Sequence, residues 1–281
     1  YQDFEIVVVD DASGDNTEEV VGKCRDTRIR YVRHETQKRV AGARNTGLLN
    51  STGQYIAFLD DDDEWLPEKL KMQVDLLDRA SSRVAGVYTG FWKIDRASGK
   101  TVGQATPTLR GNVLPALCSG NWVGTASTVV LRHECLKRVG PFDESIDFCE
   151  DYDMWIRIAQ EFEIECIEEP LVKYFVHPDK LSTNAAVLVR AYEGLLRKYG
   201  HWFASNGRSC SYLYLELGVL YCYDGNMKKG RKALLKAIQL YPYEVRHYFN
   251  LCLSLAGAES FRRVKAIREK VARLPQARSL W

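Results

Sequence analysis

The chain has 281 residues, of which 46% are hydrophobic and 27% charged, as in soluble globular proteins and unlike disordered chains. No apolar run approaches the roughly 18–20 residues that span a membrane, and the net charge of +2 does not single out nucleic acid as a partner. The 8 cysteines include no C-x-x-C pair, which argues against a zinc or redox motif. Scattered single cysteines are usual in reducing compartments, so we expect a cytoplasmic protein. From the small net charge we expect no binding to nucleic acid.

Charge is distributed unevenly along the chain. Residues 182–281 hold 17 Lys+Arg and 6 Asp+Glu, a net +11, whereas the preceding part holds 22 and 31, a net −9. An acidic first part and a basic second part indicate two functional regions. We place the predicted domains at residues 1–182 and 183–281.

The first part alternates between strand-like and helix-like patterns. Strands are predicted at residues 4–9, 29–33, 55–59 and 84–89, with helices at 15–24, at 41–50 and from Pro67 onward. This alternation predicts an α/β fold with a mostly parallel sheet flanked by helices. Residues 91–130 are rich in Gly, Thr and Pro and are expected to be less regular.

Later elements continue to the end of the chain. We expect strands at residues 127–131, 164–167 and 172–176, helices at 133–139 and 151–162, and mostly helices from residue 183. Within 211–244, Leu217, Gly218, Tyr221, Ala237 and Pro242 occupy positions typical of a tetratricopeptide repeat. The second region is therefore predicted to be a small all-α, tetratricopeptide-like extension that offers a surface to a protein partner.

An apolar strand at residues 55–59 leads directly into four aspartates, Asp60 to Asp63. Carboxylates this close repel one another, and each raises the pKa of its neighbour. A divalent cation removes that repulsion, because hard cations take carboxylate oxygens as ligands. Ligands of open α/β sheets bind beyond the carboxyl ends of the strands, so we predict a metal and a nucleotide there.

Six segments occur in a recognisable order: EIVVVDDAS, ARNTG, FLDDDDEW, VGPFDE, EDYDMW and YFVHP, beginning at residues 5, 43, 58, 139, 150 and 174. Together they resemble the family-2 glycosyltransferases of the GT-A fold, over about residues 1–180. The resemblance implies a Rossmann-like, inverting enzyme that uses a nucleotide-sugar, with UDP favoured. The acceptor is expected to be a glycan or a lipid-linked sugar.

The resemblance also implies nucleotide-binding residues. Asp10 and Asp11 lie where the family holds the base and ribose, although a helix-capping turn would use the same residues. Arg44 and Asn45 match a segment near the diphosphate. Arg44 suits phosphate through its planar fork and equally suits a surface salt bridge, while Asn45 either touches the nucleotide or positions a loop.

By the same resemblance, Asp60 and Asp62 match the D-x-D motif. Asp62 is the first choice as ligand of Mn²⁺ or Mg²⁺, with Asp60 on the ribose or as a second ligand. Asp61 is assigned to the nucleotide side, with a solvated turn residue as the alternative. His177 is a further candidate ligand, although a lone His more often has a structural hydrogen-bonding role.

The segment at residue 150 supplies the expected catalytic base. Asp151 would take the proton of the acceptor hydroxyl, supported by Glu150, for which a helix cap is the alternative. Trp122, Gly124 and Thr125 are assigned to the acceptor side, with burial in the core as the alternative for Trp122.

Apolar and basic residues alternate at helical spacing over residues 261–274. Such a helix lies on an anionic membrane or packs on the preceding helices. The first alternative implies a cytoplasmic protein in peripheral contact with the membrane, and the second implies no membrane contact through this segment.

The sequence departs from the family at its start, where the usual first strand, turn and helix are absent. We therefore expect an N-terminally truncated domain with weakened donor binding. The competing hypothesis is a non-catalytic interaction protein, in which a degenerate transferase domain accompanies the helical repeat.

Overall fold

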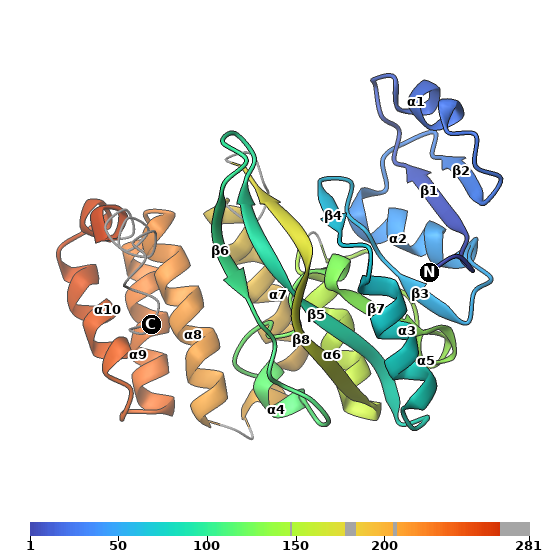
Figure 1. The fold of residues 1–281 in the computed structure, drawn as a ribbon. Coiled ribbons are helices and arrows are strands. Elements are labelled where there is room, and N and C mark those ends of the chain that lie inside the picture. Colours follow the sequence, from blue (N-terminus) through green and yellow to red (C-terminus); the bar gives the residue numbers. More distant parts are fainter. Residues whose placement is uncertain (147, 178–183, 205–206, 265–281) are drawn as a thin grey trace. The chain divides into compact units, whose positions relative to one another are not determined.

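The computed structural model describes residues 1–146, 148–177, 184–204 and 207–264, which fall in two compact units (Figure 1). The first unit comprises Tyr1–Lys93, Gln104–Leu114 and Trp122–Phe175. The second comprises Ile94–Gly103, Pro115–Asn121 and Val176–Trp281. The first two segments and the start of the third fall in the region predicted as the first domain. The predicted boundary after residue 182 lies within residues 178–183, outside the described part.

The first unit begins with a small parallel sheet. Strand β1 (Ile6–Asp10) pairs with β2 (Ile29–Arg33) in a register that runs from Ile6 opposite Ile29 to Asp10 opposite Arg33. Helix α1 (Thr17–Lys23) connects the two strands, and α2 (Arg39–Leu49) packs against β1. This parallel strand–helix–strand unit agrees with the alternation predicted for this region.

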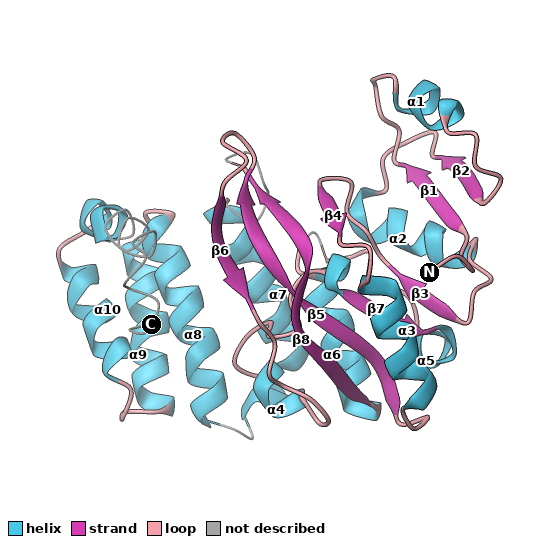
Figure 2. Cartoon of the chain, in the orientation of Figure 1, coloured by secondary structure: helices cyan, strands magenta, loops and turns pink. Residues whose placement is uncertain are grey.

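The main sheet is six-stranded (Figure 2). Its strands are β3 (Tyr55–Ala57), β4 (Asp63–Trp65), β5 (Val84–Asp95), β6 (Thr101–Ala105), β7 (Val129–Arg132) and β8 (Glu163–Val176). They lie in the order β3-β7-β5-β8-β4, with β6 beside β5. The mixed α/β architecture confirms the predicted fold class.

The prediction of a mostly parallel main sheet is wrong for its described strand pairs. Strand β7 is antiparallel to both β3 and β5, and β4 is antiparallel to β8. Because β7 opposes both neighbours, β3 and β5 run parallel to each other, as expected for strands joined by helix α3 (Lys69–Arg79). The distant β7 inserts between them, which local alternation cannot reveal.

Two boundaries in the middle of the chain also differ from expectation. Strand β5 extends to Asp95 and pairs with β6, inside a region predicted to be irregular. Strand β8 is continuous where two strands were predicted around Pro170. A Cβ at Gly90 would lie 2.4 Å from the carbonyl oxygen of Ala105 in β6 and 3.1 Å from Cα of Pro170 in β8, so the glycine permits the close approach of both strands.

Helices cover the main sheet and close its core. Helix α3 packs on β7, and α5 (His133–Val139) packs on β7 and α6 (Glu150–Glu161). One core cluster joins Leu77 of α3 to three strands of the sheet, through Val84 and Val87, Val130, Ile167 and Leu171. Helix α6 buries Trp155 completely.

The described part of the second unit is dominated by four helices. They are α7 (Ala185–Ala204), α8 (Gly207–Tyr223), α9 (Met227–Leu240) and α10 (Val245–Leu255), and each packs on the next. A Cβ on Gly230 would lie 2.4 Å from Sγ of Cys222, so glycine permits the close approach of α8 and α9. These helices confirm the prediction of a helical C-terminal region. That the region contains a tetratricopeptide repeat stays a prediction. In the described residues, no helix is both long and apolar enough to cross a membrane.

Candidate active site

The acidic run forms a turn between two strands. The N–H of Asp63 donates to the carbonyl oxygen of Asp60 over 3.0 Å, which leaves Asp61 and Asp62 at the tip of the turn. Asp61 is exposed and Asp62 is half-buried. Asp63 is buried at the start of β4, opposite Tyr174 of β8, and so belongs to the sheet.

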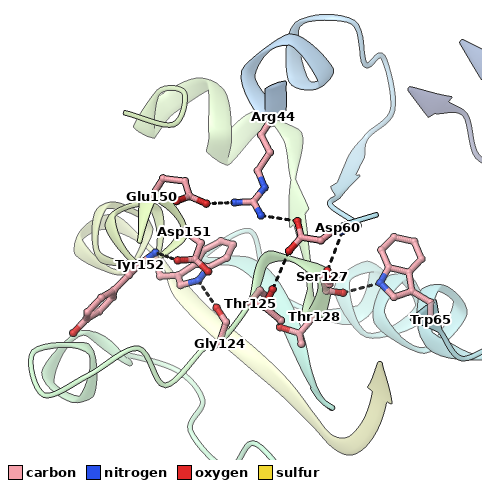
Figure 3. A network of polar contacts seen from close by, with 11 residues as sticks. Arg44, Asp60, Trp65, Gly124, Thr125, Ser127, Thr128, Glu150, Asp151 and Tyr152 are labelled. Atoms are coloured by element: carbon pink, nitrogen blue, oxygen red, sulfur yellow. Dashed lines mark hydrogen bonds and ion pairs between the residues drawn. The ribbon is translucent and has the colours of Figure 1, made fainter. Parts of the chain in front are cut away.

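Arg44 of α2 joins the acidic turn to helix α6 (Figure 3). Its Nη2 lies 2.6 Å from Oδ1 of Asp60, and its Nη1 lies 2.5 Å from Oε1 of Glu150. The side chains of Arg44 and Glu150 are 11% and 9% exposed. The neighbouring carboxylates raise the pKa of Arg44 despite its burial, so one buried cation holds two carboxylates from segments far apart in sequence.

Asp60 is also fixed by the segment that precedes β7. The hydroxyl of Thr125 donates to Oδ2 of Asp60 over 3.3 Å, and the N–H of Asp60 donates to Oγ of Ser127 over 3.1 Å. Ser127 is fully buried, and its carbonyl oxygen accepts a hydrogen bond from Nε1 of Trp65 over 2.7 Å. The main chain and the side chain of Asp60 are thus both anchored.

Asp151 lies in the first turn of α6, next to this network (Figure 3). The N–H of Tyr152 donates to its Oδ1 over 2.6 Å. The preceding residue, Cys149, has a φ of 68°, a left-handed conformation that is uncommon for a residue with a side chain. Such backbone strain is often found at functional sites, and here it stands directly before Glu150 and Asp151.

The surroundings of Asp151 favour its protonated form. Burial of the carboxyl group, followed by the negative charge of Glu150, raises the pKa of Asp151 to about 7. Arg44 and the N–H of Tyr152 oppose this shift. A carboxylate with a pKa near neutral pH can both accept and release a proton, as a general base requires.

The side chain of Asp10 makes hydrogen bonds and an ion pair with residues near the end of the β1–β2 sheet. Its side chain is buried, accepts a short hydrogen bond from the hydroxyl of Tyr31, and pairs with Arg33 over 3.2 Å. The N–H of Ser13 donates to Oδ1 over 2.7 Å. The hydrogen bonds from Tyr31 and Ser13 lower the pKa of Asp10 to about 2. These contacts make Asp10 a structural residue of the β1–β2 end, and its contact with a nucleotide stays a prediction.

Asp11 organises the start of α2. Its carboxylate accepts from the N–H groups of Lys38 and Arg39, each over 2.8 Å, and lies 2.7 Å from Nδ1 of His34. Nε2 of His34 in turn lies 2.8 Å from the hydroxyl of Thr46. The capping interpretation applies here, although the capped helix is α2 rather than the next helix in sequence.

Asn45 positions a loop. Its amide group accepts from the N–H of Phe142 over 2.8 Å and donates to the carbonyl oxygen of Phe142 over 2.9 Å and to Glu144 over 2.8 Å. Phe142 packs edge-on against Phe58, with the ring centroids 5.2 Å apart. Of the two predicted roles, these contacts correspond to loop positioning, and they hold the loop beside Arg44.

No group of three or more His, Cys, Asp or Glu side chains arranged to hold a metal is found among the residues that the structure describes. A cation that shares the diphosphate of a substrate needs only one or two protein carboxylates. Asp62 at the turn fits that requirement, whereas both oxygens of Asp60 already have partners. His177 belongs to the second unit, so its predicted role as a ligand stays a prediction.

The predicted acceptor-side residues lie in the segment before β7. The carbonyl oxygen of Gly124 accepts a hydrogen bond from Nε1 of Trp155 in α6 over 3.1 Å, which connects this segment to the helix of Asp151. Trp122 is 58% exposed, so burial in the core does not account for it. Contact of Trp122, Gly124 or Thr125 with an acceptor stays a prediction.

Several residues that organise the site were not predicted from sequence. The sequence predicted neither the contact of Ser127 with Asp60 nor the contact of Trp155 with Gly124. Their partners lie 67 and 31 residues away in sequence. No local pattern indicates such contacts, because they depend on how distant segments meet in the fold.

Comparisons with known proteins identify the family. The model of "Glycosyl transferase family 2" matches residues 1–125. The chain is 34% identical over 188 residues to UDP-Glc:alpha-D-GlcNAc-diphosphoundecaprenol beta-1,3-glucosyltransferase WfgD of Escherichia coli, a match that covers 66% of this chain and 70% of WfgD. The chain belongs to glycosyltransferase family 2. It is therefore an enzyme, and the hypothesis of a non-catalytic interaction protein is not favoured.

Other family members extend the comparison. A second glucosyltransferase of Escherichia coli, WfaP, has the same activity in its name and is 29% identical over 82% of this chain and 88% of WfaP. The chain spans a smaller share, 62%, of an uncharacterized glycosyltransferase of Rickettsia typhi that is 28% identical over 69% of this chain. The matches thus cover 70% of WfgD and 88% of WfaP, and a smaller share of the Rickettsia relative.

Solved structures share the fold. S. aureus TarS, residues 1–349, is 18% identical with a TM-score of 0.57, over 95% of this chain and 82% of that chain. The mannosyltransferase PcManGT of Pyrobaculum calidifontis is 19% identical with a TM-score of 0.56, over 97% of this chain and 77% of that chain. These neighbours confirm the predicted GT-A fold.

Proposed function

We propose that this family-2 glycosyltransferase transfers a sugar from a UDP-sugar to a hydroxyl of a lipid-linked glycan, with inversion at the sugar carbon and Asp151 as the catalytic base. The observation that carries the proposal is the meeting of three segments at one place. Arg44 joins the acidic turn at Asp60 to Glu150, and the adjacent Asp151 has a pKa raised to about 7. Direct displacement requires such a base.

The donor is proposed from the relatives. WfgD and WfaP have UDP-Glc in their names, and TarS has been solved in complex with UDP. PcManGT has been solved with GDP-Man instead, so a guanine nucleotide is the natural competitor in a binding test. We assign the nucleotide to the acidic turn, with Asp61 and Asp60 on its ribose side.

Proton transfer is assigned to Asp151. Its second carboxylate oxygen would accept the proton of the acceptor hydroxyl as the hydroxyl oxygen forms a bond to the anomeric carbon. The bond between that carbon and the phosphate oxygen breaks at the same time, and its electron pair leaves with the nucleoside diphosphate. Tyr152 orients the carboxyl group through its N–H, and Glu150 keeps Arg44 in place.

A divalent cation is part of the proposal. PcManGT has been solved with Mn²⁺, and Asp62 offers a half-buried carboxylate at the tip of the turn. Asp62 would be the main protein ligand of Mn²⁺ or Mg²⁺. The cation would supply charge stabilisation to the departing diphosphate as a Lewis acid.

Membrane contact is proposed for the second unit. The acceptors in the names of WfgD and WfaP are carried on diphosphoundecaprenol, which favours an enzyme that works at a membrane surface. Most of the segment predicted for this contact, residues 261–274, lies outside the described residues. Helix α9 offers a described alternative, because all exposed residues from Lys228 to Lys236 except Leu235 are basic.

Calorimetric titration with UDP tests the donor site. The wild-type protein should bind UDP in the presence of Mn²⁺, more tightly than GDP, and Asp62→Ala should abolish the metal-dependent part of the binding. Asp224→Ala, which removes an exposed carboxylate from the turn between α8 and α9, is the matched control. Equal binding of UDP by Asp62→Ala and wild type would contradict the assignment.

A further inference from the structure

Lys69 is a buried lysine that follows the acidic turn in sequence. It is the first residue of α3 and is completely buried. Its Nζ has no hydrogen-bond partner in the described part of the chain, and it lies 4.1 Å from the centroid of the Trp65 ring. An ammonium group without a polar partner is costly to bury, so its presence calls for a physical explanation.

Trp65 connects Lys69 to the acidic turn through two contacts of its indole ring. One face of its indole ring contacts the amine of Lys69, while its Nε1 donates to the carbonyl oxygen of Ser127. The hydroxyl of Ser127 accepts from the N–H of Asp60. Lys69 therefore lies at the end of an unbroken chain of contacts that reaches Asp60 (Figure 3 shows the part from Trp65 onward).

Helix α3 supports the same segment at a second point. Gln73 follows Lys69 by one helical turn and is also completely buried. Its Nε2 donates to the carbonyl oxygens of Val87 and Thr128 over 2.6 and 2.9 Å. The buried polar side of α3 thus fixes Thr128 directly and Ser127 through Trp65.

We propose that Lys69 and Trp65 are positioning residues for the donor site: the lysine amine holds the indole ring, and the ring holds Ser127 and, through it, Asp60. Neither residue is assigned a contact with substrate. Residues that orient ligating carboxylates typically change metal affinity or activity 10–100-fold when they are replaced. The inference concerns the geometry of the turn and goes beyond the proposed donor, so part of its test requires no ligand.

The test that requires no ligand is amide hydrogen exchange. Lys69→Met keeps the volume of the side chain and removes its amine, and it should accelerate exchange at the N–H of Asp60 about tenfold. Lys71→Met is the matched control, because Lys71 lies in the same helix and is exposed, with an ion pair to Asp75 of 2.6 Å. Exchange at Asp60 that is unchanged in Lys69→Met would overturn the proposal.

A second variant separates the contacts of the indole ring. Trp65→Phe keeps an aromatic face for Lys69 and removes the hydrogen bond to Ser127, so it should also accelerate exchange at Asp60. If Trp65 connects Lys69 to Asp60, adding Lys69→Met to Trp65→Phe should produce little further change. Additive effects of the two substitutions would overturn the chain of contacts.

Ligand binding then distinguishes this inference from the proposed function. With UDP and Mn²⁺ as probes, Lys69→Met should raise the dissociation constant about tenfold, and Lys71→Met should not. In an active preparation, the KM for the donor should rise more than kcat falls. Wild-type protein that fails to bind UDP would contradict the proposed donor, and the exchange experiment would still decide the role of Lys69.

Discussion

Arg44 in α2 and Asp60 after β3 form an ion pair of 2.6 Å, and the other terminal nitrogen of the same guanidinium holds Glu150 of α6. The three residues come from segments that are separated in sequence by 16 and 106 residues. Removing the cation leaves two carboxylates facing each other in a largely buried place. The pair therefore connects the stability of the first unit to the geometry of the proposed donor site.

The substitution Arg44→Gln should destabilise the protein by about 3 kcal/mol, because breaking a buried ion pair leaves its partner charge uncompensated. It should also raise the pKa of Asp151 further, since Arg44 acts to lower it. Urea unfolding measures the first effect, with the exposed Arg79→Gln as the control. Similar free energies of unfolding for the two variants would show that the network is not important for stability.

Asn45→Ala should also destabilise the first unit. The substitution removes three hydrogen bonds to the loop at Phe142 and Glu144 and leaves buried backbone groups of Phe142 without partners. A loss of about 2–3 kcal/mol is expected, because unsatisfied buried groups are costly. Thermal unfolding checks it, with the exposed Asn16→Ala as the control; an unchanged melting temperature would contradict the positioning role.

The buried side chain of Lys69 should make the free energy of unfolding depend on pH. Burial lowers the pKa of Lys69 from 10.5 to about 7, so between these values the unfolded chain binds a proton that the folded chain does not. Stability should therefore rise as the pH increases from about 7 toward 10, by about 1 kcal/mol per pH unit from this group. Below about pH 7 both states are protonated, and this contribution becomes constant.

Urea unfolding of Lys69→Met and Lys71→Met between about pH 7 and pH 9 measures this contribution. The rise with pH should be smaller in Lys69→Met than in wild type, because the titrating group has been removed. Lys71→Met should follow the wild-type curve. Parallel curves for all three proteins would contradict the shifted pKa of Lys69.

The basic face of α9 predicts binding to anionic membranes. Replacing Lys228, Arg231 and Lys232 by Gln removes three exposed charges, each worth about 1 kcal/mol near an anionic surface. Co-sedimentation with vesicles that contain phosphatidylglycerol should fall strongly, whereas neutral phosphatidylcholine vesicles should bind little of either protein. Replacing the exposed Arg25, Lys100 and Lys137 by Gln removes the same charge elsewhere and should have little effect. Equal losses for the two triple variants would contradict a specific surface.

Local patterns predicted the strand and the helix that carry the candidate site residues, whereas the roles of Arg44, Glu150 and Asp151 came from the family resemblance. The apolar run before Asp60 and the first turn that carries Asp151 lie where strand and helix signals placed them, because both signals depend on neighbouring residues. The insertion of β7 between β3 and β5 could not be predicted in this way. Strand neighbours are chosen by packing across the whole sheet, and no short segment contains that information.

The same distinction applies to side-chain roles. A carboxylate at the end of a strand is compatible both with ligand binding and with a structural role. In the structure, Asp10 contacts Tyr31 and Arg33, and Asp11 accepts hydrogen bonds from N–H groups at the start of α2, while a contact of either residue with a nucleotide stays a prediction. The sequence offers an identical motif for either use. Arg44 likewise has partners that sequence could not name, since Glu150 lies 106 residues away in sequence.

The most direct measurement is sugar transfer by Asp151→Asn, with UDP-glucose as donor and a GlcNAc-diphosphate lipid as acceptor, beside calorimetric binding of UDP and Mn²⁺. The asparagine cannot take the acceptor proton, so kcat should fall by about 10²–10⁴-fold while the dissociation constant for UDP stays similar. In wild type, the rate should rise with pH through about 7, as Asp151 loses its proton. Transfer by Asp151→Asn at the wild-type rate, with the same pH profile, would contradict the assignment of Asp151 as the catalytic base.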